Sequence, residues 1–413
     1  MINFKQYTGF SDIIVAFQHI LAMLGAVYFI ALATNMDASL VMLTSGIATV
    51  VFHFIAQREV PFLLGPSFTF IAAINSVHLP GQIGITKGAI ITIGFVYFLV
   101  ALCIKYYGVN KIRLLFPPVV TGPIIIVVGI TLCKMASELV GYNQLDNTVD
   151  ARVFSVAIIT AITMIYLFIM SKGKFRLYTI IIPVIIGWIS STFILGKVNI
   201  FWGDDAKWFG FSERAIDSLI TRPVFDFNSM FVFSVVSLLL LVEHIGEVAA
   251  SSAVTNKDFF KHPGLHRTIL GDGVASIISG FLGGPPKTPY SENTCFLAVS
   301  GVLKPTVILT AGVMLIIFSF FGKFSGLLQT VPEPVMGAIQ FVLYGIIISI
   351  GIRTLIRSRV DFSLNRNIVI CSLIIMIGLT IPEIHITENF EVKGLVLATI
   401  VGVVLNLILP DFE

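Results

Sequence analysis

Apolar runs about as long as a bilayer is thick follow one another along almost the whole chain, and no other feature limits its fold as strongly. A transmembrane helix needs about 20 mostly apolar residues. Only 12% of the 413 residues are charged and 56% are hydrophobic, whereas a soluble domain carries about 25% charged residues. The sequence therefore predicts an all-α, multi-pass membrane protein.

About fourteen elements are expected, each an apolar run between polar or Gly- and Pro-rich connections. Two of them, 61–77 and 291–302, are short and follow Gly and Pro, which is typical of broken helices that start with a few extended residues. The expected spans are 11–33, 38–56, 61–77, 84–105, 115–138, 153–171, 178–197, 229–252, 267–283, 291–302, 305–322, 331–352, 365–381 and 392–409.

The chain also repeats itself. His19 and His244 lie 225 residues apart, and Ser67 and Glu292 follow them by 48 residues each. A third match, between FPPVVTG and VPEPVMG, keeps the same order. Because seven elements is an odd number, the second copy would enter the membrane from the opposite side. The matches predict a 7+7 inverted repeat, as in secondary transporters, with the site where the two broken elements meet.

Lys and Arg gather in the connections on the side that holds both ends of the chain. This bias predicts that both termini are cytoplasmic. The start, MINFKQYTGFSD, lacks the pattern of a cleavable signal peptide. The longest polar connection, 196–228, is expected to join the two halves on the outside, with Trp202 and Trp208 near the interface.

Two glutamates in apolar surroundings mark a candidate site: Glu243 and Glu292. Ionisable groups at membrane depth usually face a polar cavity or an ion path. The alternative is that one or both lie in loops near a helix end. Two close carboxylates in a low dielectric do not readily ionise together, so one should hold a proton that can serve for coupling. Glu247, one turn after Glu243 on the same face, is a third proton candidate, or else a glutamate that faces water.

The broken helices suggest which substrate these carboxylates serve. Backbone N–H groups at Phe68 and Ser291, at the start of two half-helices, can donate to carbonyl oxygens of a ring. The carboxylates of Glu243 and Glu292 can accept its N–H groups. Phe68 and Tyr290 offer stacking surfaces. The pattern favours a neutral or proton-accompanied ring, because two carboxylates would repel an anion.

The remaining polar residues indicate little further chemistry. His19 either bonds towards the site, where it would help coupling, or is a satisfied core group; for His244 packing is favoured. No histidine has metal-ligand spacing, and the cysteines have no CxxC pattern. No nucleophile elbow, phosphate loop or nucleic-acid patch is evident. We expect no enzyme activity, no cofactor or metal other than a coupling proton, and no nucleic-acid partner.

Several motifs resemble the nucleobase–ascorbate transporter family, most closely its bacterial uracil permeases. The resemblance covers essentially the whole chain, and PGLHR with the following GDG and ISGF, and PEPVMG, are its most specific parts. The segments that carry it are QHILAMLGA (18–26), GPSFTFI (65–71), LFPPVVTG (115–122), VEHIGE (242–247), DFFKHPGLHRTILGDGVASIISGFLGG (258–284), TPYSEN (288–293) and VPEPVMGAIQFVLYGIIISIGIR (331–353).

This resemblance implies a proton-coupled importer of a nucleobase in the cytoplasmic membrane, with uracil as the favoured base. It also implies a homodimer in the lipid bilayer. It implies a core domain, formed by 1–114 and 229–325, and a gate domain, formed by 115–228 and 326–413. A non-transporting sensor is disfavoured, because no signalling domain is evident at either end.

The resemblance also assigns residues. It implies that Glu243 and Glu292 bind the base, and that Phe68 and Ser291 stand at or beside the backbone amides that meet its carbonyls. Glu247 stands where uracil permeases carry histidine.

Other positions depart from the family pattern. Ser291 replaces the usual Gly, and Lys287 the usual Asn. Cys295 and Gly301 depart from the signature that follows Glu292 and leave xanthine or another purine as the alternative substrate.

Overall fold

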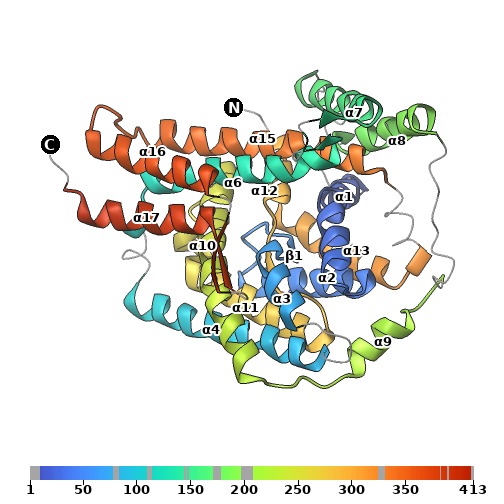
Figure 1. Cartoon of the computed structure of the whole chain (residues 1–413), viewed down its shortest axis with the longest axis horizontal. Helices are drawn as coiled ribbons and strands as arrows, with labels where there is room; N and C mark the ends of the chain where they lie inside the picture. Colours follow the sequence, from blue (N-terminus) through green and yellow to red (C-terminus); the bar gives the residue numbers. More distant parts are fainter. Residues whose placement is uncertain are drawn as a thin grey trace.

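The computed structural model describes residues 10–77, 83–108, 114–143, 146, 148–170, 178–196, 208–323, 331–381, 383–387 and 390–410, which form a bundle dominated by helices (Figure 1). Six of these helices are long and apolar enough to cross a membrane: α2, α4, α6, α7, α10 and α15. The helical membrane protein expected from the apolar runs is therefore what the chain forms. The count of fourteen elements and their 7+7 arrangement stay predictions.

The helices begin and end close to the limits expected from hydropathy. The bounds are α1 Phe10–Ala33, α2 Ala38–Ile55, α3 Ile71–Val77, α4 Ile83–Tyr107, α6 Pro118–Leu139, α7 Ala151–Met170, α8 Ile181–Ile194, α9 Glu213–Ile220, α10 Phe227–Thr255, α11 Leu265–Leu282, α12 Ser291–Ser300, α13 Pro305–Ser319, α15 Glu333–Arg357, α16 Asn365–Thr380 and α17 Gly394–Ile408, with the short turns η1 Phe68–Phe70 and η3 Phe260–Gly264.

The two short elements are broken, as predicted. Strand β1 (Leu64–Pro66) precedes η1 and α3, and strand β4 (Lys287–Pro289) precedes α12. The two strands pair antiparallel, with Leu64 opposite Pro289 and Pro66 opposite Lys287. Proline lacks a backbone N–H and disfavours helix in the residue before it, which explains why the chain stays extended here. Each half-helix therefore starts at the strand pair.

The chain forms two strand pairs beyond the two short extended segments that were expected, so it is mostly helical rather than all-α. β2 (Tyr142–Asn143) pairs with β3 (Thr148–Val149), and β5 (Glu383–Thr387) pairs with β6 (Phe390–Lys393). The last expected span, 392–409, accordingly begins in β6, and its helix starts at Gly394. These hairpins lie in short connections, where apolar periodicity carries no signal.

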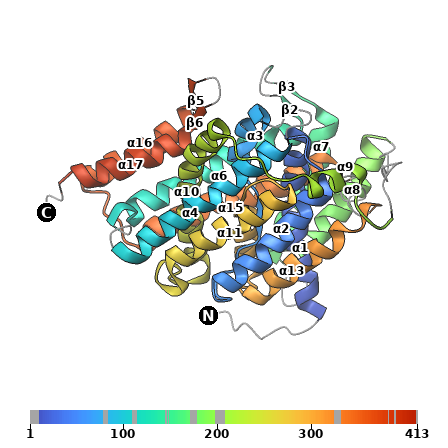
Figure 2. The same ribbon diagram turned by 90° about the horizontal axis from the view of Figure 1, so that it is seen from below.

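The helices pack in two groups (Figures 1 and 2). In one group α11 packs along α4 and α2, and α13 packs along α2 and α1. In the other, α6 packs along α15 and α16, and α7 packs along α8 and α15. Helices α10 and α12 of the first group contact α15 of the second, and α10 also contacts α6. The site described below lies at this junction.

Two glycine pairs let helices of the first group approach closely. A Cβ added to Gly46 of α2 would lie 2.6 Å from the carbonyl oxygen of Gly312 in α13. A Cβ added to Gly94 of α4 would lie 2.6 Å from the carbonyl oxygen of Gly273 in α11. Small residues allow such backbone contacts between membrane helices. The same contact thus occurs in α2–α13 and in α4–α11, the two pairings that the predicted repeat makes equivalent.

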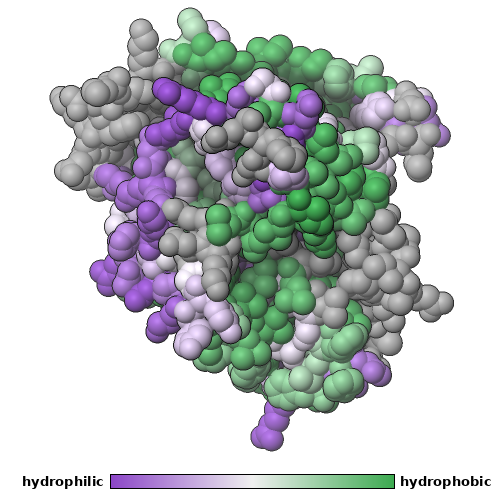
Figure 3. All heavy atoms as spheres, turned by 90° about the vertical axis from the view of Figure 1, so that its left-hand side faces the viewer, coloured by the Kyte–Doolittle hydropathy of each residue, from purple (hydrophilic) through white to green (hydrophobic). Residues whose placement is uncertain are grey.

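Large apolar side chains cover much of the surface. On α7, Tyr166 is 62% exposed and Ile169 is 68% exposed. On α4, Leu99 is 62% exposed. Figure 3 shows hydrophobic residues across one face, with hydrophilic residues gathered along its edge. Such side chains suit contact with lipid. In the connection 196–228 the structure forms α9 and exposes Trp208, whereas Trp202 lies outside the described residues.

Candidate substrate site

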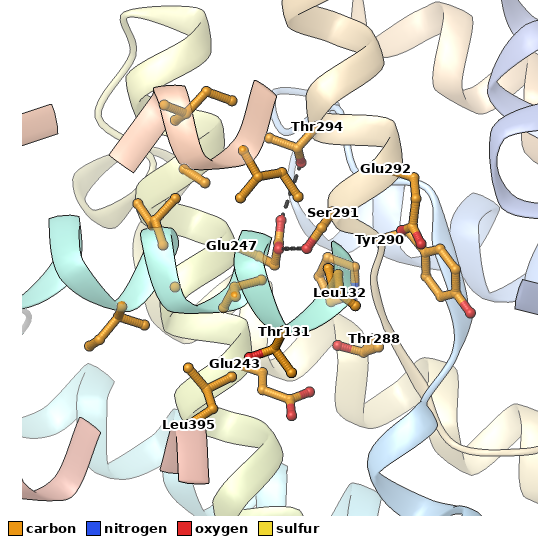
Figure 4. A pocket seen from close by; sticks show the side chains of 18 of the residues that line it. Thr131, Leu132, Glu243, Glu247, Thr288, Tyr290, Ser291, Glu292, Thr294 and Leu395 are labelled. Carbon is orange, nitrogen blue, oxygen red and sulfur yellow. Dashed lines mark hydrogen bonds between the residues drawn. The ribbon is translucent and has the colours of Figure 1, made fainter. Parts of the chain in front are cut away.

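A cavity of about 230 Å³ lies between the two helix groups (Figure 4). One wall comes from η1, α10, β4 and the start of α12, and it supplies most of the polar groups. The opposite wall is mostly apolar and comes from α6, α15, α16 and α17. Small-molecule pockets commonly occupy about 300–1,000 Å³. Because the volume of this cavity lies just below that range, it suits one small ring rather than a larger ligand.

Glu243 and Glu247 line the cavity from the same face of α10, as their spacing predicts. Thr69 of η1 donates a 2.7 Å hydrogen bond from its hydroxyl to Oε1 of Glu243. Glu243 is only partly buried, so its carboxylate remains accessible from the cavity. The first broken helix thus holds the glutamate that the second half of the chain supplies.

Glu247 is held by the first turn of α12. The hydroxyl of Ser291 donates to Oε1 of Glu247, and the hydroxyl of Thr294 donates to Oε2 over 3.3 Å. Both bonds are drawn in Figure 4. Glu247 is 8% exposed. The alternative that it merely faces water is therefore disfavoured.

Glu292 also lines the cavity, and its partner comes from α15 of the other helix group. The hydroxyl of Tyr344 in α15 donates a 2.7 Å hydrogen bond to Oε1 of Glu292. Both residues are buried. In Figure 4, Glu292 lies beside Tyr290, on the far side of Ser291 from Glu247. The three carboxylates of Glu243, Glu247 and Glu292 thus share one cavity.

Tyr290 joins the two extended segments. Its hydroxyl donates to the carbonyl oxygen of Pro66 over 2.8 Å, and its ring lies over Gly65, where an added Cβ would come within 2.1 Å of a ring carbon. Only glycine fits at that position. Tyr290 lines the cavity, so a stacking role is open to it. The backbone of Phe68 begins η1, but its side chain lies outside the described part of the structure.

The start of α12 adds backbone donors to the cavity wall. The first N–H groups of any helix have no acceptor within the helix and carry partial positive charge. Ser291 is the first residue of α12 and lines the cavity. This geometry fits the amide donor predicted there, and the role of the amides at Ser291 and Phe68 stays a prediction.

His19 and His244 lie behind the site and do not line the cavity. His19 is fully buried, does not line the cavity, and its Nδ1 lies 2.7 Å from Oδ1 of Asn293. His244 contacts Asp272 over 2.6 Å and the Thr268 hydroxyl over 2.9 Å. His19 therefore supports α12 next to Glu292, whereas His244 ties α10 to α11.

Three polar contacts of the site were not anticipated: Thr69, Thr294 and Tyr344. Thr69 is next to Phe68, and Thr294 follows Glu292 by two residues in the first turn of α12, so their place in the broken helices was a usable signal. Tyr344 lies within an apolar stretch of α15, and nothing local distinguishes it from a packing residue. Cys295 and Gly301, on which the purine alternative rested, are not among the residues that line the cavity.

The protein is a bundle of apolar helices, and its cavity lies where two broken helices meet and is lined by carboxylates. These features together define a membrane transporter. The sequence profile of the permease family matches residues 10–387. The chain therefore belongs to this family, the nucleobase–ascorbate transporters that its motifs predicted.

Relatives of known name cover nearly the whole chain. The uracil permease of Bacillus caldolyticus is 38% identical over 404 residues, 96% of this chain and 92% of that protein. The uracil permease of Bacillus subtilis is 38% identical over 408 residues, 98% and 94% of the two chains. The uracil permease of Escherichia coli K12 is 33% identical over 392 residues, 95% and 89%.

Solved structures share the fold at low identity. The transmembrane domain of the cyanobacterial bicarbonate transporter BicA has a TM-score of 0.57 at 15% identity and covers 96% of this chain and 97% of its own. The structure of SLC26A9 has a TM-score of 0.59 at 10% identity and covers 95% of this chain and 64% of its own. At such identities the likeness concerns the fold alone.

Proposed function

We propose that this chain imports uracil together with a proton across the cytoplasmic membrane. The observation that carries the proposal is the cavity itself, where Glu243 of α10 contacts η1 and Glu247 of α10 contacts the N-terminal turn of α12. The uracil permeases among its relatives, at 33% to 38% identity, support the choice of base.

Uracil matches the groups that the cavity offers. It is a small neutral ring that carries N–H donors and carbonyl acceptors. The N–H groups would donate to the accessible carboxylate of Glu243 and to Glu292, and the carbonyls would accept from the amides at Ser291 and Phe68. Tyr290 would pack against the ring. A permanent anion would meet three carboxylates and one lysine, Lys134, in the same cavity, and this excess of carboxylates disfavours it.

Glu247 is proposed to hold the coupling proton. It lies one turn from Glu243, so that ionising both in a cavity of low dielectric costs Coulomb energy. Its oxygens contact the hydroxyls of Ser291 and Thr294, which can accept a hydrogen bond as well as donate one. The contacts can therefore accommodate either state of the carboxyl group. His19, which lies behind Asn293, would act on the coupling only through α12.

The proposed architecture is a core domain of 1–114 and 229–325 and a gate domain of 115–228 and 326–413, related internally by the inverted repeat. The preferential packing within each helix group supports the division, and the matching glycine contacts of α2–α13 and α4–α11 support the repeat. We also propose a homodimer with both termini in the cytoplasm, which follows from the family and from the basic connections.

The purine alternative has no support from the cavity, because Cys295 and Gly301 do not line it. Gly301 instead ends α12 with a φ of 71°, a conformation that favours glycine. We therefore propose uracil as the substrate.

Uptake of radiolabelled uracil into proteoliposomes tests the proposal. With an acidic exterior, uptake should exceed equilibration and collapse when a protonophore removes the gradient. Unlabelled uracil should compete better than xanthine or adenine. Empty liposomes and Glu243→Gln serve as controls. Uptake that a proton gradient does not drive would overturn the coupling, and stronger competition by xanthine would overturn the choice of base.

A further inference from the structure

Lys287 is a completely buried lysine that the proposed transport cycle does not use. It opens β4, opposite Pro66 of β1. Its side chain is 0% exposed, and Nζ donates to the Ser45 hydroxyl over 2.9 Å and to the carbonyl oxygen of Val41 over 3.3 Å. Within the described residues no carboxylate forms a salt bridge with it. Among the described residues, the side-chain nitrogen of Lys287 therefore contacts neutral oxygens alone.

The surroundings of this ammonium are polar although they lie deep in the bundle. Ser45 donates to Val41, so the two oxygens that contact Nζ belong to one turn of α2. The backbone N–H of Lys287 donates to the Ser276 hydroxyl of α11. Burying a charge is costly unless hydrogen bonds hold it. Two helices, α2 and α11, thus supply oxygens to the start of β4.

Such an arrangement has the chemistry of a monovalent cation site. In transporters, carbonyls at interrupted helices coordinate Na⁺, and hard cations prefer oxygen ligands. Here a carbonyl and a hydroxyl point at one positive charge beside a strand that interrupts a helix. The next two residues, Thr288 and Pro289, line the cavity that holds three glutamates. Lys287 therefore lies one residue along β4 from the wall of that cavity, while its side chain contacts α2.

We propose that the carbonyl of Val41 and the hydroxyl of Ser45 form part of a monovalent-cation site that this chain fills with its own Lys287 ammonium. A tethered cation takes the place of a dissolved one, so that transport needs no Na⁺. The cation site stands on its own geometry, and only its effect on uptake rests on the proposed function.

Two substitutions separate the charge from the space that it occupies. Lys287→Ala removes both and leaves room for an ion, whereas Lys287→Met removes the charge but fills the space. We expect the Tm of purified Lys287→Ala to rise to a plateau as NaCl is added, and not to rise with choline chloride. An ion that binds only the folded state stabilises that state. Uracil uptake by this variant should be about tenfold higher in NaCl, the scale set by leaving a charged hydrogen-bonding site unsatisfied. The parent and Lys287→Met should show no response to Na⁺.

Lys87 supplies a matched control. It is also buried, and its Nζ donates to the carbonyl oxygens of Ser218 and Thr221 at the end of α9, away from the broken helices. Lys87→Ala should gain no Na⁺ response in uptake. Adding Ser45→Ala to Lys287→Ala should abolish the response of the latter, because it removes one of the ligands.

Each outcome decides the proposal. No Na⁺ response in Lys287→Ala, or an equal effect of Na⁺ on uptake in Lys87→Ala, would overturn it. Parent-like stability and uptake in Lys287→Met would overturn it as well. If Lys287→Ala folds poorly, its recovery in membranes solubilised in NaCl and in choline chloride becomes the readout, and equal losses count against the site. The Tm measurement needs no substrate, so it decides the cation site even if the chain does not transport uracil.

Discussion

The hydroxyl of Tyr344 donates a 2.7 Å hydrogen bond to Oε1 of Glu292, and this bond joins α12 to α15, the helix whose Ile347 and Ile350 line the opposite side of the cavity. Tyr344 belongs to α15, which packs along α6, whereas Glu292 lies in the first turn of α12 beside β4. A substrate that contacts Glu292 therefore also acts on a bond to the opposite helix group. This gives a direct physical route from binding to relative movement of the groups.

Removing that hydroxyl tests the route. Tyr344→Phe should weaken uracil binding and slow uptake, because hydrogen bonds to charged groups contribute about 1.5–3 kcal/mol. Binding by isothermal calorimetry and initial uptake rates measure the two effects separately. Tyr97→Phe is the control, since its buried hydroxyl has no partner among the described residues. Equal effects of the two substitutions would show that the Tyr344 bond has no special role.

Glu243→Gln should lose most of the binding. Its carboxylate is the accessible acceptor of the site, and an amide replaces one acceptor oxygen by a donor. We expect a loss of about 1.5–3 kcal/mol in the free energy of uracil binding. The Thr69 hydroxyl can still donate to the remaining carbonyl oxygen, so the fold should persist, which the Tm of the variant checks. If the folded variant binds uracil with the affinity of the parent, the base does not contact Glu243.

Glu292→Gln should change which base is preferred. The amide offers a donor where the carboxylate offered only acceptors, so uracil should bind more weakly relative to xanthine. Tyr344 can donate to the amide oxygen, which keeps the bond between α12 and α15. Competition by unlabelled bases measures the ranking. An unaltered ranking would mean that Glu292 does not read the edge of the ring.

Glu247→Gln should flatten the pH dependence of uptake. A carboxyl group gains its proton as the pH falls, so uptake by the parent should rise with external acidity. Glutamine resembles the protonated form at every pH, and binding in detergent should therefore stay close to that of the parent. Glu247→His should keep some coupling with a shifted optimum. If Glu247→Gln still concentrates uracil under a pH gradient with the profile of the parent, the residue is a bystander.

The glycine contacts predict a stability effect away from the cavity. Gly46→Ala should lower the Tm, because its Cβ would lie 2.6 Å from the Gly312 carbonyl oxygen and force α2 away from α13. Gly345 of α15 is a matched control, since an added Cβ there meets nothing within 4 Å. Gly345→Ala should leave the Tm unchanged or raise it, as alanine favours helix over glycine by about 0.5–1 kcal/mol. A lower Tm for both would contradict the close-contact explanation.

Hydropathy located the helices well because a spanning helix must bury its own backbone groups and keep apolar side chains towards lipid. The Gly and Pro residues around Gly65 and Pro289 indicated the two interruptions for an equally local reason, since they disfavour helix. The hairpins β2–β3 and β5–β6 were missed, because short polar connections carry no such constraint.

The sequence by itself determined the class of protein, the two broken helices and the acidic residues of the site, Glu243, Glu247 and Glu292. Each follows from local chemistry, in which a charge or a helix breaker stands out against an apolar background. Only the tertiary structure decided the partners of those carboxylates. Tyr344 lies 52 residues from Glu292, and Thr69 lies 174 residues from Glu243. Hydrogen bonds act over about 3 Å in space, whatever the distance along the chain, so packing alone selects them.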